Sequence, residues 1–146
     1  MTTDGNKELV RQLIQALNDN RIQDLDELVA ASYDQDNPSV YPGREGLKSL
    51  FTRLRMAFPD LNVSIQQLIA EGDHVVAVTS MQGTQQGELP GIEATGRSVN
   101  VSSMDLYRLQ DDRIVEHFGR FDELGMLEQL GVAHDLEWPG SRQEPT

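Results

Sequence analysis

The chain has 146 residues, no cysteine, and 24 Asp and Glu residues against 12 Lys and Arg, which gives a formal net charge of −12 at pH 7. This length is enough for one hydrophobic core, so we expect a single domain over residues 1–146, and the lack of cysteine excludes disulfides and thiol chemistry. The excess of acidic residues argues against nucleic acid as a partner. The sequence has neither a basic, apolar leader nor a segment of transmembrane length, so we expect a cytoplasmic protein without membrane contact.

Three amphipathic helices are predicted in the first part of the chain, because apolar residues recur at helical spacing over residues 6–18, 22–29 and 44–58. The apolar positions are Leu9, Val10, Leu13, Ile14, Leu17, Ile22, Leu25, Leu28, Val29, Leu47, Leu50, Phe51, Leu54 and Phe58. Residues 32–43, SYDQDNPSVYPG, combine Asp and Asn with two prolines. We expect a long polar loop there.

From residue 61 onward the apolar pattern changes toward the period of two that is typical of strands. Strands are expected over residues 61–66, 74–84, 99–109 and 113–121, with a Gly-rich loop at 85–98 and a tight turn at 110–112. Asp122 is a natural cap for a short helix that ends before Gly131. The tail from His134, with two prolines and a glycine, is expected to be loosely ordered.

This order of elements predicts an α+β fold, in which three helices pack on one face of a curved antiparallel sheet of about four strands. The other face of such a sheet is left without a cover. We therefore expect a homo-oligomer formed through that face, with Val99, Val101 and Ser103 as suitable contact residues.

Residues 87–131 resemble the SnoaL-like polyketide cyclases of the nuclear-transport-factor-2-like superfamily. The residues that carry the likeness are Gly91-Ile92, Thr95-Gly96-Arg97, Asp105, Arg108, 113–117 (RIVEH), Asp122 and 127–131 (LEQLG). The likeness continues more weakly through residues 42–47 and the first two helices. It implies a cone-shaped α+β barrel whose sheet wraps around the three N-terminal helices and encloses an apolar cavity. It also implies a dimer or tetramer, and neither a metal nor an organic cofactor.

The resemblance implies an enzyme acting on an aromatic polyketide of the anthracycline type, with Asp122 as the acid/base of an intramolecular aldol condensation that closes a ring of a polyketide ester. Asp36 stands where many relatives carry histidine, and the family also includes proteins assigned to hydroxylation of anthracycline rings. A hydroxylase with a reductase partner is therefore an alternative. A third interpretation is a non-catalytic binding protein for an apolar molecule, in which Asp122 only caps a helix.

Flanking Phe118, Phe121 and Met126 would desolvate the carboxylate of Asp122 and raise its pKa, as suits a general base. The residues alone still favour a simple helix cap at Asp122, and the resemblance reverses that preference. Alternation along residues 113–121 places Glu116 and Phe118, rather than His117, on the side of Asp122. No histidine is assigned a catalytic role, and no histidine pair has the spacing of a metal site. The predicted site residues are Asp122 and Asp36 for catalysis, and Asn37, Phe51, Asp105, Tyr107, Glu116, Phe118 and Met126 for substrate binding.

Overall fold

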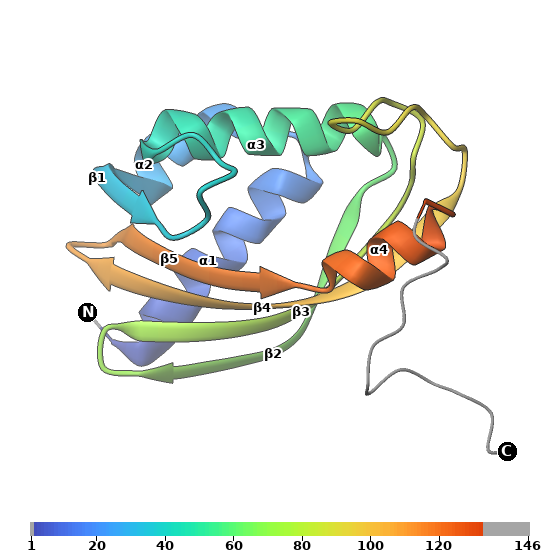
Figure 1. The fold of residues 1–146 in the computed structure, drawn as a ribbon. Coiled ribbons are helices and arrows are strands. Elements are labelled where there is room, and N and C mark those ends of the chain that lie inside the picture. Colours follow the sequence, from blue (N-terminus) through green and yellow to red (C-terminus); the bar gives the residue numbers. More distant parts are fainter. Residues whose placement is uncertain (1, 133–146) are drawn as a thin grey trace, which may run out of the picture.

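A computed structural model describes residues 2–132 of the chain, so the predicted loose tail from His134 lies outside the described residues. The elements follow the α+β order that the sequence predicts (Figure 1). The helices are α1 (Thr3–Asn18), α2 (Leu25–Leu28), which continues a short 3-10 turn at Ile22–Asp24, α3 (Gly43–Ala57) and α4 (Glu123–Gln129). Within the described residues, no helix has the length and apolar character needed to cross a membrane.

The sheet has five strands rather than the four that were expected. They are β1 (Val29–Gln35), β2 (Asn62–Glu71), β3 (His74–Thr84), β4 (Ser98–Gln110) and β5 (Arg113–Phe121), in the order β1-β5-β4-β3-β2. Strands β2 to β5 form the predicted antiparallel meander, but β1 pairs in parallel with β5. The sheet is therefore mixed and unclosed. The prediction missed β1 because only Val29 and Tyr33 of this strand are buried, which leaves no alternating pattern in the sequence.

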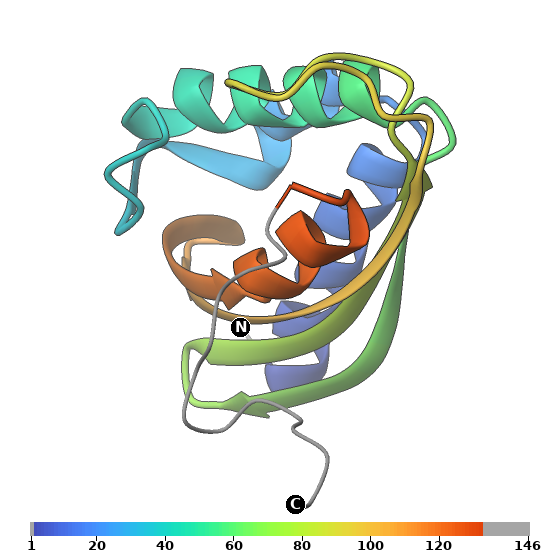
Figure 2. The ribbon, with the colours of Figure 1, turned by 45° about the vertical axis from the view of Figure 1, so that its right-hand side comes forward.

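The sheet curves strongly, and α1 lies in its concave side while α3 runs along the open top (Figure 2). Side chains from both helices, such as Leu13, Leu17 and Phe51, are buried against residues of the sheet in one hydrophobic core. Phe58, directly after α3, is fully buried in the same core. The apolar faces of the helices thus pack against the sheet as their spacing predicted, and the cone-shaped arrangement is confirmed.

A bulge in β5 decides which side chains face the concave side. Leu109 pairs with Ile114 and Arg108 pairs with Glu116, so Val115 is an extra residue between two successive pairs. An extra residue reverses the alternation beyond it. Ile114 and His117 therefore face the concave side, and Glu116 faces the convex side, which corrects the faces that simple alternation predicted.

The convex side of the sheet carries an apolar row that crosses four strands. Successive cross-strand pairs join Ile69 to Val76, Val76 to Leu106, and Leu106 to Phe118. We call these four residues the outer row, and three of them are exposed large hydrophobic side chains, as is the neighbouring Met104. Val99 and Val101, which were expected on this face, are instead buried in the core.

Candidate active site

The concave side of the sheet encloses a cavity of about 320 Å³. Its walls are mainly apolar side chains from the helices, including Leu13, Leu17, Leu47, Leu50, Phe51 and Leu54. The polar side chains that the strands bring to its wall include Tyr33, Thr79, Ser103, Asp105, Tyr107 and His117. A few convergent polar groups in a mostly apolar hollow are the usual composition of a small-molecule site.

Asp105 and His117 form a hydrogen-bonded pair in this cavity. The Nε2 atom of His117 lies 2.7 Å from Oδ1 of Asp105, and the Ser103 hydroxyl donates to Oδ2 of Asp105 over 2.8 Å. Because a carboxylate can only accept, the short contact to His117 needs a proton on Nε2. In the neutral imidazole the lone pair is then on Nδ1, which has no hydrogen-bond partner within residues 2–132.

The strand register explains how the two side chains meet. Tyr107 pairs with His117 and Asp105 pairs with Gly119, so both side chains of the pair point inward from neighbouring strands. The rings of Tyr107 and His117 are stacked, with centroids 4.8 Å apart. A Cβ atom at Gly119 would lie 2.2 Å from Oδ1 of Asp105 and 2.7 Å from Nε2 of His117. The glycine therefore leaves the space in which the pair forms.

Two buried tyrosines stand beside the pair. Burial raises the pKa of Tyr107 well above its ordinary value, and the charge of Asp105 raises it further. Burial likewise raises the pKa of Tyr33, again with Asp105 as the leading charge. Both phenols therefore stay protonated at neutral pH and are able to donate hydrogen bonds to a bound molecule.

An ion pair lies where β1 and β5 end. The guanidinium of Arg120 is 2.6 Å from Oδ2 of Asp36, and the backbone N–H of Gly119 donates to Oδ1 of Asp36. The hydrogen bond from Arg120 is the main reason that the pKa of Asp36 is lowered. Asp36 and Arg120 both border the cavity, so the pair sets the charge at its edge.

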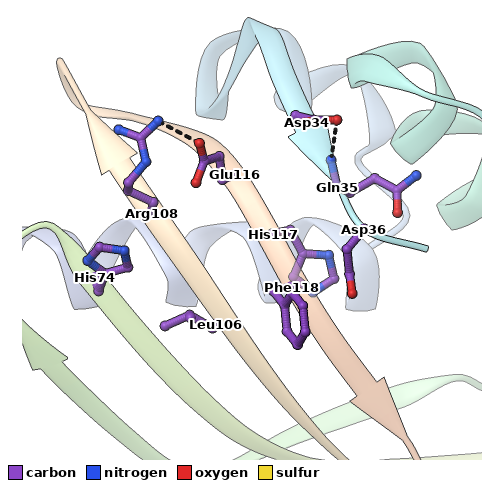
Figure 3. A pocket seen from close by; sticks show the side chains of 9 residues that line it. All are labelled: Asp34, Gln35, Asp36, His74, Leu106, Arg108, Glu116, His117 and Phe118. Carbon is purple, nitrogen blue, oxygen red and sulfur yellow. Dashed lines mark hydrogen bonds and ion pairs between the residues drawn. The ribbon is translucent and has the colours of Figure 1, made fainter. Parts of the chain in front are cut away.

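A second hollow of about 300 Å³ lies on the convex side, and Figure 3 shows its nine lining residues. At one end Arg108 and Glu116 form an ion pair of 2.9 Å, which lowers the pKa of Glu116. Phe118 and Glu116 both line this outer pocket, and neither lines the cavity. The structure thus separates these two predicted binding residues from the cavity, because the bulge at Val115 turns them outward.

The other predicted site residues divide into two groups. Asn37, Phe51, Asp105, Tyr107 and Met126 border the cavity together with Asp36. Asp122, in contrast, has an exposed side chain whose Oδ1 accepts a hydrogen bond of 2.9 Å from the Gly125 backbone N–H. It is the N-cap of α4. The apolar enclosure that was expected to raise the pKa of Asp122 is therefore not present.

Polar residues of the cavity that the sequence did not predict include Tyr33, Ser103 and His117. His117 was placed on the wrong face because the cavity side of β5 was taken from Asp122, which lies outside the cavity, and Tyr33 was assigned to a loop. The sequence did hold one usable signal, since Asp105 and Tyr107 were recognised as sharing a face. Among residues 2–132, no three His, Asp or Glu side chains lie close enough together to hold a metal ion.

Comparisons with known proteins identify the family and support the fold. A family model described as SnoaL-like polyketide cyclase matches residues 7–130. The aklanonic acid methyl ester cyclase DnrD of Streptomyces peucetius is 30% identical over 139 residues, which cover 90% of this chain and 92% of that protein. The cyclase of the same description from Streptomyces sp. (strain C5), DauD, is also 30% identical, with 90% and 83% covered. The structure of TsrD from Streptomyces laurentii superposes with a TM-score of 0.86 at 29% identity, covering 91% of this chain and 99% of that one.

Proposed function

The chain belongs to the family of SnoaL-like polyketide cyclases, and we propose that it is an enzyme that closes a ring of an anthracycline-type polyketide ester by intramolecular aldol condensation. The observation that carries the assignment of its chemistry is the Asp105–His117 pair inside an apolar cavity. An aldol closure needs a base, a donor for the oxygen that gains charge, and a shape that brings the two carbons together. The cavity has groups suited to each need.

In this proposal His117 is the base. Its Nδ1 lone pair takes a proton from a carbon flanked by two carbonyl groups, and Asp105 stabilises the imidazolium that forms. The electron pair left on that carbon forms a bond to a ketone carbon of the same molecule, and the ketone π electrons move to its oxygen. The imidazolium returns the proton to this oxygen, so the product is an isomer of the substrate and the base is regenerated.

The remaining cavity residues have simpler roles in the proposal. Phe51 and Met126 give apolar walls for a flat ring system, and Tyr107 donates a hydrogen bond to a substrate oxygen. Asn37 is less suited to this, since its Oδ1 already accepts from the Ser39 N–H over 2.9 Å. Asp36 acts by holding Arg120 at the edge of the cavity.

The test is incubation of the purified protein with aklanonic acid methyl ester, the compound named in the description of the two relatives. We expect a product of unchanged mass with a new chromatographic and absorption signature. A product heavier by one oxygen atom, formed with a reductase present, would replace the cyclase by a hydroxylase. Binding without any product would leave a carrier protein.

Variants separate the two candidate bases. We expect His117→Ala and Asp105→Asn each to lower turnover on the order of 10²-fold or more, since general base catalysis contributes about that much. Asp122→Asn is the matched comparison, because asparagine caps a helix about as well as aspartate and should leave turnover and melting temperature unchanged. A large loss of turnover in Asp122→Asn at unchanged melting temperature would transfer the base role from His117 to Asp122.

We also propose that the outer row mediates association with a second copy of the chain. Three of its four side chains, Ile69, Leu106 and Phe118, are exposed on a sheet face that no helix within residues 2–132 covers. Exposed apolar patches of this kind favour a protein partner. Light scattering at micromolar concentration should give the mass of a dimer or tetramer, and Leu106→Lys should reduce it to the monomer. Gln82→Lys, on the same face but outside the row, is the control. A monomeric wild-type protein would contradict the proposal.

A further inference from the structure

Tyr33 and Gln35 are the polar side chains that β1 brings to the cavity, and Tyr33 combines burial with an unused hydrogen-bonding group. Its side chain borders the cavity and the residue is only 4% exposed. Its hydroxyl has no hydrogen-bond partner among the described residues. This oxygen is not one of the fully buried side-chain atoms that lack a partner, so it keeps accessible surface although the residue as a whole is buried. A hydroxyl in this state at the wall of a cavity is free to donate a hydrogen bond to a bound molecule.

The surroundings of Tyr33 keep its proton in place. The carboxylates of Asp105, Asp34 and Asp36 all disfavour a phenolate, and burial disfavours it more strongly still. Tyr33 also acts on Tyr107, whose pKa it raises, so the two phenols are close enough to influence each other beside Asp105. A neutral phenol in such a place is a donor and not a base.

On the basis of the proposed cyclase function, we propose that Tyr33 is a catalytic residue whose phenol donates a hydrogen bond to the substrate oxygen that gains negative charge during ring closure. That oxygen is first the carbonyl oxygen of the enolate and then the alkoxide of the new ring. Tyr33 keeps its proton throughout, because the proton that moves is the one carried by His117. A donor that is already in position and excluded from water stabilises the charge as it develops.

Removing the Tyr33 hydroxyl distinguishes a catalytic role from a purely structural one, because the two roles predict different effects on turnover. If Tyr33 only filled the core, Tyr33→Phe would leave turnover unchanged. As a donor, Tyr33→Phe should lower kcat on the order of 10²-fold, with a small change in KM, because the bond strengthens only as charge develops. The melting temperature should stay nearly unchanged, since the hydroxyl has no hydrogen bond to another described residue that the variant could remove.

The first measurement is turnover of aklanonic acid methyl ester by the wild-type protein, Tyr33→Phe, and the control Tyr41→Phe, whose ring is 74% exposed. Tyr41→Phe should behave as the wild-type protein. If the wild-type protein cyclises the ester and Tyr33→Phe retains kcat within about twofold, well short of the 10²-fold expected for a lost oxyanion donor, the Tyr33 proposal is overturned while the proposed function stands.

A second measurement decides the matter if the wild-type protein does not act on this ester. A naphthol whose fluorescence reports its ionisation is titrated into each variant, because a bound naphtholate carries its charge on an oxygen as an enolate does. The quantity compared is the ratio of the affinity for naphtholate to the affinity for the neutral naphthol. This ratio should be about tenfold higher in the wild-type protein than in Tyr33→Phe, as expected for one hydrogen bond to a charged oxygen. Equal relative affinity in the two proteins would overturn the proposal, and a tenfold difference without turnover would support Tyr33 as an oxyanion donor while the cyclase function fails.

Discussion

The two faces of the sheet are built from alternate residues of the same strands and have opposite characters. On β4, Asp105 and Tyr107 face the cavity, where apolar side chains from the helices surround them. Leu106, between them in the chain, points to the convex side and is exposed there. The concave face therefore buries polar groups among apolar ones, and the convex face exposes apolar groups among polar ones.

A hydrogen-bonded pair of polar side chains on each face shows what this difference means. The side chains of His117 and Asp105 are 23% and 16% exposed, whereas those of Arg108 and Glu116 are 29% and 55% exposed. Charge interactions strengthen as water is excluded, and exposed ion pairs contribute little to stability. Interactions of similar length therefore differ in strength, and the pair on the concave face, where water is largely excluded, is the one to which we assign the proposed chemistry. On the convex face, the exposed Arg108–Glu116 pair contributes to solubility and lies beside the outer row.

The largest expected difference between the faces is in packing. Phe58→Ala removes a fully buried ring from the core and should lower the free energy of unfolding by about 3–5 kcal/mol. Phe118→Ala, the matched change on the convex face, should lower the free energy of unfolding of the monomer by less than about 1 kcal/mol, because Phe118 is 54% exposed in the single chain. Urea unfolding of both variants at one protein concentration makes the comparison. Equal losses would mean that the convex face is covered as fully as the core.

Gly119→Ala should disturb the concave face alone. The new methyl group would meet the Asp105–His117 pair, and a displacement of catalytic groups by about 1 Å costs on the order of 10² in turnover. Ser102→Ala changes an exposed residue on the convex face of β4 and should leave turnover unchanged. The assay is turnover of the ester at a temperature well below unfolding. Full activity in Gly119→Ala would show that the pair does not take part in the reaction.

The smallest effect is expected at the convex ion pair, and it depends on pH. Because Arg108 lowers the folded-state pKa of Glu116, the pair stabilises the fold above the unfolded-state pKa of Glu, about 4.3, and this stability is lost as pH falls through the lowered value. Wild-type protein should therefore be slightly more stable than Glu116→Gln at pH 7, and the two should converge in acid. Urea midpoints of both proteins, measured from pH 7 downward, check this prediction. A stability difference between wild type and Glu116→Gln that grows in acid would contradict a lowered pKa of Glu116.

Helices and the meander were predictable because their signals are local. The spacing of Leu13 and Leu17 fixes one face of α1, and the turn residues at 110–112 join β4 to β5 where expected. Asp111 and Asp112 both adopt positive φ, of 52° and 60°, as a tight hairpin turn requires. The N-cap role of Asp122 is equally local, and it was recognised beside the catalytic interpretation.

The polar site was only half predictable. Asp105 and Tyr107 were correctly placed on one face, because β4 alternates without interruption up to Tyr107. Their partner His117 was missed because the cavity side of β5 was taken from Asp122, which caps α4 outside the cavity. The local pattern also does not mark Val115 as the extra residue of a bulge, so counting from Ile114 gives no warning. The place of Tyr33 depends on β1 pairing with β5, some eighty residues along the chain.

The sequence by itself determined the elements, the family likeness and the acidic, cysteine-free character of the protein, because these depend on neighbours in the chain and on composition. The tertiary structure alone decided which strand face encloses the cavity, that β1 joins the sheet, and that Asp105 meets His117 while Asp122 stays outside. The physical reason is that a side chain's direction in a strand alternates strictly. One bulged residue, accommodated through hydrogen bonds to a distant strand, therefore reverses the face of every residue that follows it.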